Sequence, residues 1–289
     1  MNEVSNTFAG FIALIGRPNV GKSTLLNHII GQKISITSKK AQTTRHKILG
    51  IKTTENTQFI YCDTPGLHEK TQRKINYFMV KQALRAIKDV DIIVYVLEAK
   101  RWQAGDDYII QELKKQNLPV VVCVNKIDQY KNKQTLLPII DQIQQKLKEA
   151  GLPVMEILPI SAEKNIGIEQ LETVLSRLLP ESPFLFSEEQ MTDKSERFYT
   201  SEIIREKLMR SLAQELPHTL TVSIETFQMK KDILHIHAVI WVEKQGQKKI
   251  IIGAKGEKLK TIGRLARQDL ENYFGHQVYL NLWVKVKSG

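Results

Sequence analysis

The sequence predicts an α/β domain with a mostly parallel sheet, followed by a smaller α+β domain that has its own core. First, short apolar strands alternate with amphipathic helical segments up to residue 180, which is typical of strand–helix–strand crossovers. Second, the order of elements changes after that point. Third, the chain has 289 residues, about twice the length of a common single domain of ~150 residues.

The first domain is expected to span residues 1–180. Its expected strands are 11–15, 47–52, 58–63, 92–98, 119–125 and 154–159. Its expected helices are 22–30, 77–87, 106–115, 135–150 and 168–179. Residues 33–46 are polar and are expected to form a loop. Strands as continuously apolar as Ile92–Leu97 are typical of a sheet that is buried on both faces, so helices are expected on both sides.

The second domain is expected to span residues 195–289, after a linker at 181–194 that Pro183 keeps from being helical. Its expected elements are a helix at 195–214, strands at 220–227 and 233–243, a helix at 257–273 and a strand at 277–287. Alternate apolar residues of the last strand are expected to face one core: Val278, Leu280, Leu282, Val284 and Val286.

The charge of the chain favours a polyanionic partner, either nucleic acid or an anionic lipid surface. Lys and Arg number 42 against 31 Asp and Glu, which gives a net charge of +11. Residues 230–289 hold 12 of these basic residues and five acids, so +7 of that charge lies in this segment. The longest apolar run has six residues, far below the ~20 of a membrane-spanning helix. Cys62 and Cys123 are too few for a disulfide framework or a zinc site, and we expect buried thiols in a cytoplasmic protein.

Residues 16–23 fit the pattern G-x-x-x-x-G-K-[ST] between an apolar strand and a helix. In such a loop the backbone N–H groups and the helix N-terminus bind phosphate oxygens. Lys22 would place its charge on the β- and γ-phosphates, and the Ser23 hydroxyl would bind Mg²⁺. The predicted phosphate-binding residues are Gly16, Arg17, Pro18, Asn19, Val20, Gly21, Lys22, Ser23, Thr24 and Gly66.

Three further segments end successive strands and favour GTP. Asp63 and Gly66, in DTPG, would place a carboxylate near the metal and an N–H near the γ-phosphate. Asp128, in NKID, could accept the N1 proton and the 2-amino group of guanine, which adenine does not offer in that arrangement. The backbone of the SAEK segment could contact guanine O6. The predicted guanine-binding residues are Asn125, Lys126, Asp128, Ser161, Ala162 and Glu163.

The sequence motifs GRPNVGKST, QTTRH, DTPG and NKID resemble those of the bacterial Era family of GTPases. The GAKG motif between a strand and a helix resembles that of a KH domain. The resemblance covers nearly the whole chain. It implies a GTPase that binds the 3′ region of 16S rRNA and acts in assembly of the 30S ribosomal subunit. It also implies GTP or GDP and Mg²⁺ as cofactors, with K⁺ as a further candidate.

The resemblance assigns residue roles as well. Ser23 and Thr44 would ligate Mg²⁺, with Asp63 acting through water, and Asn19 would hold K⁺; as a turn residue after Pro18, Asn19 also has a purely structural interpretation. The switch residues would be Gln42, Thr43, Thr44, Asp63, Thr64, Pro65, Gly66 and Leu67. Leu67 stands where Ras-type GTPases have a glutamine that orients water, and leucine has no hydrogen-bonding group. We therefore predict slow intrinsic GTP hydrolysis. The adjacent His68 is either a solvent-exposed switch residue or a substitute for the missing glutamine.

The basic segment would bind single-stranded RNA through the loop at 253–256. The predicted RNA-binding residues are Gly253, Ala254, Lys255, Gly256, Lys258 and Lys260. Ile250–Ile252 and Ile262 are candidates either for a groove wall or for the core. Trp241 and Trp283 could stack bases, but their place in mid-strand favours a position in the core or in an interface. His235 and His237 alternate on a strand and favour packed or solvated histidines over metal ligands.

Two other hypotheses remain open. The basic domain could bind anionic lipid, with the helix at 195–214 amphipathic through Ile203, Ile204, Leu208 and Leu212. The chain could also be a GTPase that modifies transfer RNA, although the second domain has no cysteine. The expected partners are 16S rRNA and the 30S subunit, with peripheral association at the inner face of the cell membrane as an added option. A monomer is expected.

Overall fold

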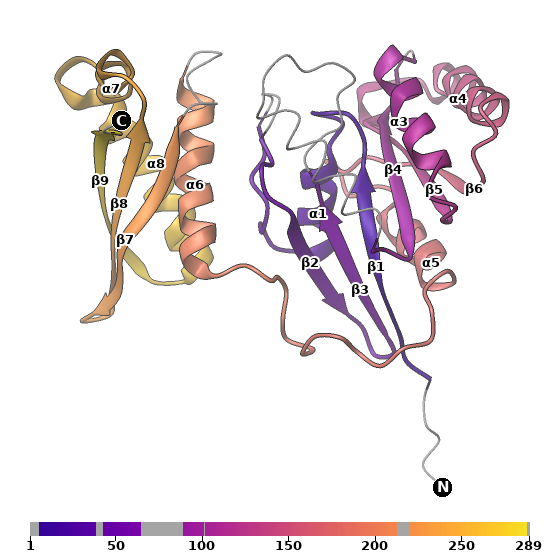
Figure 1. The fold of residues 1–289 in the computed structure, drawn as a ribbon, viewed down its shortest axis with the longest axis horizontal. Coiled ribbons are helices and arrows are strands. Elements are labelled where there is room, and N and C mark those ends of the chain that lie inside the picture. The colour runs from indigo at the N-terminus through magenta and orange to yellow at the C-terminus, as the bar shows by residue number, and fades with distance from the viewer. Residues whose placement is uncertain (1–5, 39–42, 65–88, 101, 213–219, 288–289) are drawn as a thin grey trace, which may run out of the picture. The chain divides into compact units, whose positions relative to one another are not determined.

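The structure is a computed structural model, and it describes residues 6–38, 43–64, 89–100, 102–212 and 220–287 (Figure 1). The chain forms two compact units. The first contains Met1–Ser35 and Thr44–Asp193, and the second contains Ile36–Thr43 and Lys194–Gly289. The expected helix at 77–87 lies outside the described residues. Each unit is described by itself below.

The first unit is built on a six-stranded sheet in the order β2-β3-β1-β4-β5-β6. Only β2 is antiparallel to its neighbour, so the predicted mostly parallel sheet is confirmed. The strands are β1 (Phe8–Ile15), β2 (Ile48–Thr53), β3 (Thr57–Asp63), β4 (Ile92–Glu98), β5 (Val120–Asn125) and β6 (Val154–Pro159). The helices are α1 (Lys22–Ile30), α3 (Ala104–Lys114), α4 (Leu137–Glu149) and α5 (Ile168–Ser176).

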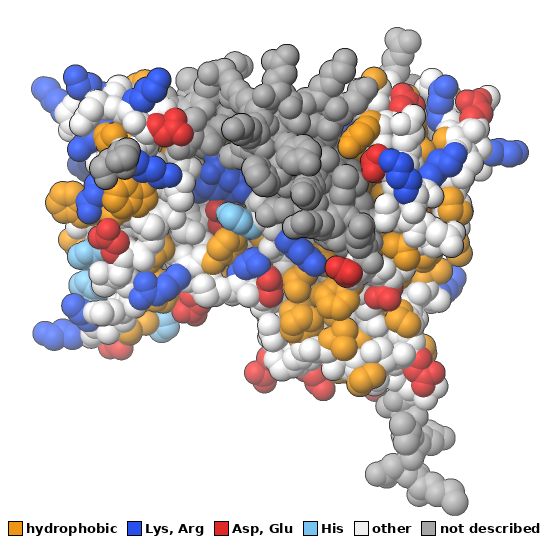
Figure 2. All heavy atoms as spheres, in the orientation of Figure 1, with side chains coloured by type: hydrophobic (Ala, Val, Ile, Leu, Met, Phe, Trp, Pro, Cys, Tyr) orange, Lys and Arg blue, Asp and Glu red, His pale blue; other side chains and the backbone are white. Residues whose placement is uncertain are grey.

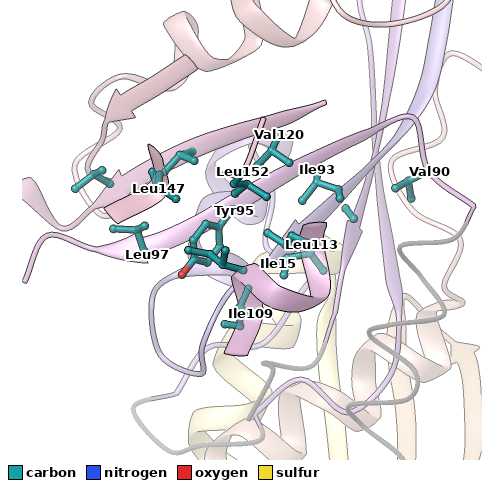
Figure 3. Close-up of a cluster of buried hydrophobic side chains, with 14 of the residues drawn as sticks. Ile15, Val90, Ile93, Tyr95, Leu97, Ile109, Leu113, Val120, Leu147 and Leu152 are labelled. Carbon is teal, nitrogen blue, oxygen red and sulfur yellow. The ribbon is translucent and has the colours of Figure 1, made fainter. Parts of the chain in front are cut away.

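Both faces of this sheet are buried. Ala13, Ile15 and Tyr95 pack with residues of α3 and α4 in one cluster (Figure 3). Ile12 and Leu14 alternate with them and are also fully buried, so they belong to the opposite face. The cysteine side chains are buried within this sheet, and burial raises the pKa of the Cys62 thiol to about 11. The expectation of buried thiols is therefore confirmed.

Several predicted element ends were wrong for identifiable reasons. Strand β1 begins three residues earlier than expected. Phe8, Ala9 and Gly10 continue its parallel pairing with β3, although Ala9 and Gly10 have small side chains that give little strand signal in the sequence. The last helix of the unit ends at Ser176 rather than 179, and the N–H groups of Leu178 and Leu179 both return to the Leu175 carbonyl in a terminal turn.

The segment between residues 180 and 193 packs along the first unit. Its backbone donates from Leu185 and Phe186 to the Gln58 carboxamide oxygen, at 2.8 and 3.0 Å. The Ile51 N–H donates to the Met191 carbonyl at 2.9 Å. These bonds hold the segment on the edge of the sheet, because Gln58 is fully buried and has no solvent to replace them.

The second unit is a three-stranded sheet in the order β7-β8-β9, with β8–β9 parallel. Its elements are α6 (Glu196–Ser211), β7 (Thr221–Lys230), β8 (Ile233–Val242), α7 (Gln245–Ile252), α8 (Glu257–Phe274) and β9 (Gln277–Val286). Residues of α6 and α8 form one core with one face of the sheet. The predicted apolar face of the last strand is confirmed, since Val278 and Val284 are buried in this core and Leu280, Leu282 and Val286 pack against it.

Two features of this unit differ from the prediction. Helix α7 was not predicted, because it is short and combines a glycine with three β-branched isoleucines, which favour a helix less than most residues do. The β7–β8 connection is only Lys231 and Asp232, both with positive φ, whereas the predicted strands at 220–227 and 233–243 leave five residues between them. Two left-handed residues in a row are typical of the tight turns that match the twist of a hairpin.

Residues 36–43 belong to the second unit although they precede it in the chain. Ile36 is 1% exposed and lies in the same core cluster as α6. The Thr37 N–H donates to the Glu206 carboxylate at 3.2 Å, and the Thr43 carbonyl accepts from Arg205 at 2.6 Å. Two described residues of this segment, Thr37 and Thr43, are therefore held by charged side chains of α6.

Candidate nucleotide-binding and RNA-binding sites

The predicted phosphate loop turns from the end of β1 into α1. Gly21 has a φ of 105°, and a Cβ atom there would lie 2.3 Å from the amide nitrogen of Asn125. A side chain at this position would therefore collide with the next part of the site. Asn19 is exposed at the tip with a φ of 64°, whereas Val20 is buried behind the loop. Thr24 lies in the first turn of α1.

Lys22 is buried inside the curve of the loop. Its ammonium donates to the Gly16 and Arg17 carbonyls, both at 3.0 Å. Burial lowers its pKa to about 8, and nearby Asp63 acts in the opposite direction. A buried ammonium that is held by neutral carbonyls is an energetically favourable position for phosphate oxygens.

Asp63 collects three hydroxyl groups at the end of β3. Its Oδ2 atom accepts from Ser23 at 2.7 Å, from Ser35 at 2.9 Å and from Thr44 at 3.4 Å. The Ser23 and Thr44 oxygens lie 3.0 Å apart. This arrangement follows from the parallel pairing of β1 with β3, which sets Leu14 opposite Asp63 at one edge of the sheet.

The other carboxylate oxygen of Asp63 is buried and has no hydrogen-bond partner among the residues that the structure describes. Burial raises the pKa of this carboxyl group, against the effects of Lys22 and the three hydroxyls. An orphaned carboxylate oxygen beside two hydroxyls is a set of hard oxygen ligands that fits Mg²⁺ or its bound water. The residues predicted for magnesium, Ser23, Thr44 and Asp63, thus lie together. Sequence reasoning missed Ser35, because a lone serine in a polar loop gives no signal.

A second missed feature connects the phosphate loop to α3. Arg17 donates to the Asp106 carboxylate at 2.8 Å and to the Gln103 side chain at 2.6 Å. Asp106 is buried and also accepts from the Tyr95 hydroxyl at 2.9 Å. Burial, together with the adjacent Asp106 carboxylate, raises the pKa of Tyr95 well above its usual range, so this hydroxyl stays protonated as a donor.

Asn125 links the phosphate loop to the predicted guanine segments. Its amide nitrogen donates to the Val20 carbonyl at 2.7 Å, and its amide oxygen accepts from the Ala162 N–H at 2.9 Å. The Ser161 hydroxyl donates to the Asp128 carboxylate at 2.5 Å. One buried side chain therefore connects the ends of β5 and β6 with the loop after β1.

The remaining guanine residues lie around this link. Lys126 has a φ of 68°, and its ammonium donates to Glu98 at 3.0 Å. Asp128 and Glu163 are exposed, as residues that meet a ligand from the surface must be. Sequence reasoning missed Glu98, which ends β4 without any motif around it.

The switch residues are only partly described. Thr64 is buried and its hydroxyl donates to the Leu14 carbonyl at 3.0 Å. Gln42, Pro65, Gly66 and Leu67 lie outside the described residues.

The predicted RNA-binding loop joins α7 to α8. Gly253 has a φ of 75°, and a Cβ atom there would lie 2.7 Å from the Cβ atom of Lys258. Gly256 has a φ of 81° and precedes the first residue of α8, which gives that helix an N-terminus free of a side chain. Ala254, Lys255 and Lys260 are exposed, and Lys258 is half-buried.

The alternatives left open for this region are now decided for several residues. Ile262 and Ile251 are fully buried in the core of the second unit, whereas Ile250 is 46% exposed. Trp283 is 55% exposed and is therefore not a core residue, which leaves base stacking and an interface as its two interpretations. It lies on the face of β9 opposite the residues that pack against the helices.

Comparisons with known proteins match a different family in each of the two parts of the chain. Residues 11–126 match the family described as 50S ribosome-binding GTPase, and residues 215–289 match the KH domain family. The GTPase Era of Pseudomonas aeruginosa is 49% identical over 280 residues, which cover 97% of this chain and 90% of that protein. The GTPase Era of Coxiella burnetii is 50% identical over 283 residues, with 98% and 94% covered.

Two solved structures resemble the whole chain. One is Era in complex with MgGDPNP and nucleotides 1506–1542 of 16S ribosomal RNA, and the other is a point variant of Aquifex aeolicus Era bound to GDP·AlF₄⁻. Each has a TM-score of 0.91 and 40% sequence identity, and the match covers 97% of this chain and 94% of the other. With this similarity along nearly its whole length, the chain belongs to the GTPase Era family, which joins a P-loop GTPase domain to a KH domain.

Proposed function

We propose that this protein binds GTP, hydrolyses it slowly, and binds the 3′ region of 16S rRNA through its KH domain during assembly of the 30S subunit. The observation that carries the proposal is the bridge made by Asn125, whose side chain connects the phosphate loop to Ala162 in the guanine segment. Phosphate and base recognition are thereby fixed to one another. The relatives described above, with a GTP analogue and 16S rRNA in one of them, support the same conclusion.

Each group of the site has a chemical task in this proposal. The Lys22 ammonium and the loop N–H groups bind the phosphates, and Asp128 accepts two hydrogen bonds from guanine. Ser23, Thr44 and Asp63 would hold Mg²⁺, which supplies positive charge to the phosphate oxygens. Asn125 and Ser161 orient the guanine segments.

Slow hydrolysis is proposed from the sequence, because Leu67 has no group that orients water. K⁺ at Asn19 is the proposed source of extra charge stabilisation. Single-turnover assays in KCl and in NaCl test both statements. We expect a low rate in NaCl and a clear increase in KCl that an Asn19→Ala variant loses. A fast rate in NaCl would contradict the proposal.

Nucleotide choice is tested by calorimetric titration of the full-length protein with GDP and with ADP in Mg²⁺. We expect GDP to bind at least ~100-fold more tightly, because adenine does not supply the two donors that guanine would offer to the Asp128 carboxylate. Asp128→Asn exchanges an acceptor for a donor and should shift preference towards xanthosine diphosphate, which has an oxygen in place of the 2-amino group. Equal affinity for GDP and ADP would remove the proposed function.

Binding to the 30S subunit, a monomeric state and a cytoplasmic location are further parts of the proposal. Association with lipid receives less support from α6, because the apolar residues that would contact lipid are buried: Ile203, Ile204, Leu208 and Leu212. In the part of the chain that the structure describes, no helix has both the length and the apolar character needed to cross a membrane. We therefore favour nucleic acid over anionic lipid as the polyanionic partner.

A further inference from the structure

In the second unit, the described helices α6 and α8 pack against one face of the KH-domain sheet and leave the other face to the strand residues alone. Alternate residues of β8 and β9, beginning with Leu234 and Val278, point into the core with α6 and α8. The residues between them point to the other side. By the strand register this open face consists of Thr221, Ser223, Thr226, Gln228, Lys230, Ile233, His235, His237, Val239, Trp241, Gln277, Tyr279, Asn281, Trp283 and Lys285.

Large aromatic side chains are exposed on this open face. Tyr279 is 51% exposed and Trp283 is 55% exposed, and both belong to β9. The His235 ring lies 5.1 Å from the Tyr279 ring, and the His237 ring lies 6.2 Å from it. In Figure 2, histidine, lysine and hydrophobic side chains gather along the left edge of the molecule, where Figure 1 draws β8 and β9.

Trp241 extends this aromatic surface in a fixed orientation. Its indole N–H donates to the Ser223 hydroxyl at 2.9 Å, and the Lys285 ammonium lies 5.8 Å from its ring centroid. Val239, in the row between Ser223 and Trp283, is fully buried. The rings therefore stand on a packed sheet and lose little side-chain freedom when a flat partner binds to them.

The chemistry of the open face favours nucleobases over a lipid or a second copy of the chain. Between the rings lie amides and hydroxyls, such as Gln228, Asn281 and Ser223, which can bond to base edges. Lys230 adds positive charge, whereas the Lys285 ammonium lies 3.7 Å from the Glu225 carboxylate. Residues 194–289 together carry 17 basic and ten acidic residues. An apolar dimer core or a lipid-facing surface would not alternate rings with amides in this way.

We propose that the open face binds single-stranded RNA, with bases stacked on Trp283 and Tyr279. The inference rests on the proposed RNA-binding function and adds a second contact to the one expected at Gly253–Gly256. Aromatic side chains on a sheet are a general means of stacking single-stranded bases. With a second contact, one KH domain would bind a longer single-stranded RNA than its Gly-x-x-Gly loop could bind alone.

The test uses the full-length protein and a fluorescent single-stranded RNA of about 12 nucleotides, a length within the range that one small domain holds. The variant is Trp283→Ala with Tyr279→Ala. Its matched control is Met229→Ala, which removes a side chain that is 50% exposed on the same sheet but lies on the other face. Because all three side chains are at least half exposed, thermal unfolding should show folded proteins.

We expect the double variant to bind the RNA about 10-fold or more weakly, since one stacked base contributes about 1–3 kcal/mol, or roughly 5- to 150-fold. The control should keep the wild-type affinity. Trp283→Phe should also keep most of the affinity while losing much of the quenching of tryptophan fluorescence by RNA, because it preserves the ring surface.

Equal RNA affinity in the double variant and the wild type would overturn this inference and leave the proposed function intact. If the wild-type chain itself binds no RNA, the proposed function fails as well. Sedimentation distinguishes a further outcome. A wild-type dimer that the double variant abolishes, with RNA affinity unchanged, would assign the open face to a second copy of the chain and overturn the RNA assignment.

Discussion

The nucleotide site contains buried charged side chains whose pKa values are set by their surroundings. Lys22 is the clearest example, because burial lowers its pKa to about 8 and its ammonium is held by two carbonyls of the loop. A phosphate beside this group favours its charged form. The pKa in the nucleotide complex must therefore be higher than in the free protein, and binding takes up a proton above about pH 8.

Nucleotide affinity should accordingly depend on pH in one direction. Below about pH 7 Lys22 is charged in both states and should add no pH dependence to the affinity for GDP in EDTA. Above about pH 8 the free protein loses the proton, so affinity should fall by up to about tenfold per pH unit. Fluorescence titrations between about pH 7 and pH 9 measure this slope. Lys22→Met, which binds more weakly at every pH, should show none; the same slope in that variant would assign the titration to another group.

The Arg17–Asp106 pair makes a separate prediction about the phosphate loop. Asp106→Ala removes the acceptor of the buried Tyr95 hydroxyl and of the Gln103 N–H, and it leaves the Arg17 guanidinium with only its bond to the Gln103 side chain. We expect a loss of about 2–3 kcal/mol in the free energy of unfolding, below the ~3–5 kcal/mol for a fully buried pair because Arg17 is partly exposed. GDP affinity should fall as well, since Lys22 bonds to the Arg17 carbonyl.

Asp107→Ala is the matched control for Asp106→Ala. It removes a neighbouring carboxylate that is exposed and accepts from the Trp102 indole, at 2.7 Å. Urea unfolding and GDP titration of both variants make the comparison. Similar losses in the two variants would mean that the helix start, and not the contact with Arg17, is what matters.

At the scale of elements, the loop between α7 and α8 shows how two glycines of one motif differ. Both have positive φ, but a Cβ atom at Gly253 would lie 2.7 Å from Lys258, while nothing in the described structure lies within 4 Å of one at Gly256. Gly256→Ala should therefore cost only the left-handed conformation, about 1–2 kcal/mol.

Gly253→Ala should cost more, because the start of α8 must move to remove the clash. We expect a loss exceeding that of Gly256→Ala by at least about 1 kcal/mol, measured by urea unfolding of the full chain. A smaller loss for Gly253→Ala than for Gly256→Ala would show that Lys258 yields freely and that the loop is not held against α8.

Sequence patterns predicted those elements and site residues that are determined by neighbouring residues in the chain. The phosphate motif and the strand-end segments fix their chemistry within a few residues, so Ser23, Asp63 and Asn125 could be named before any fold was known. Ser35 and Asp106 could not, because they reach their partners across 28 and 89 residues of chain. Helix α7 was missed for a related reason: three consecutive isoleucines favour a strand locally, and a helix forms where Ile251 can be buried in the core.

At the scale of the whole molecule, one segment of chain belongs to both halves of the proposed function. Ser35 and Thr44 bond to Asp63 in the nucleotide site. Residues 36–43 lie between them in the sequence and belong to the second unit, where Ile36 is buried and Thr37 bonds to Glu206. We propose that a change at Thr44 on exchange of GTP for GDP would be passed by covalent connection to residues that contact α6.

The measurement that tests the account most directly is the affinity of the full-length protein for RNA of the 16S 3′ sequence, in Mg²⁺ with a non-hydrolysable GTP analogue and again with GDP. The account predicts tighter binding with the analogue by about 5- to 150-fold, the usual range of coupling between two sites. Equal affinities in the two nucleotide states would contradict it, because a chain that holds RNA regardless of its nucleotide cannot use hydrolysis to time release.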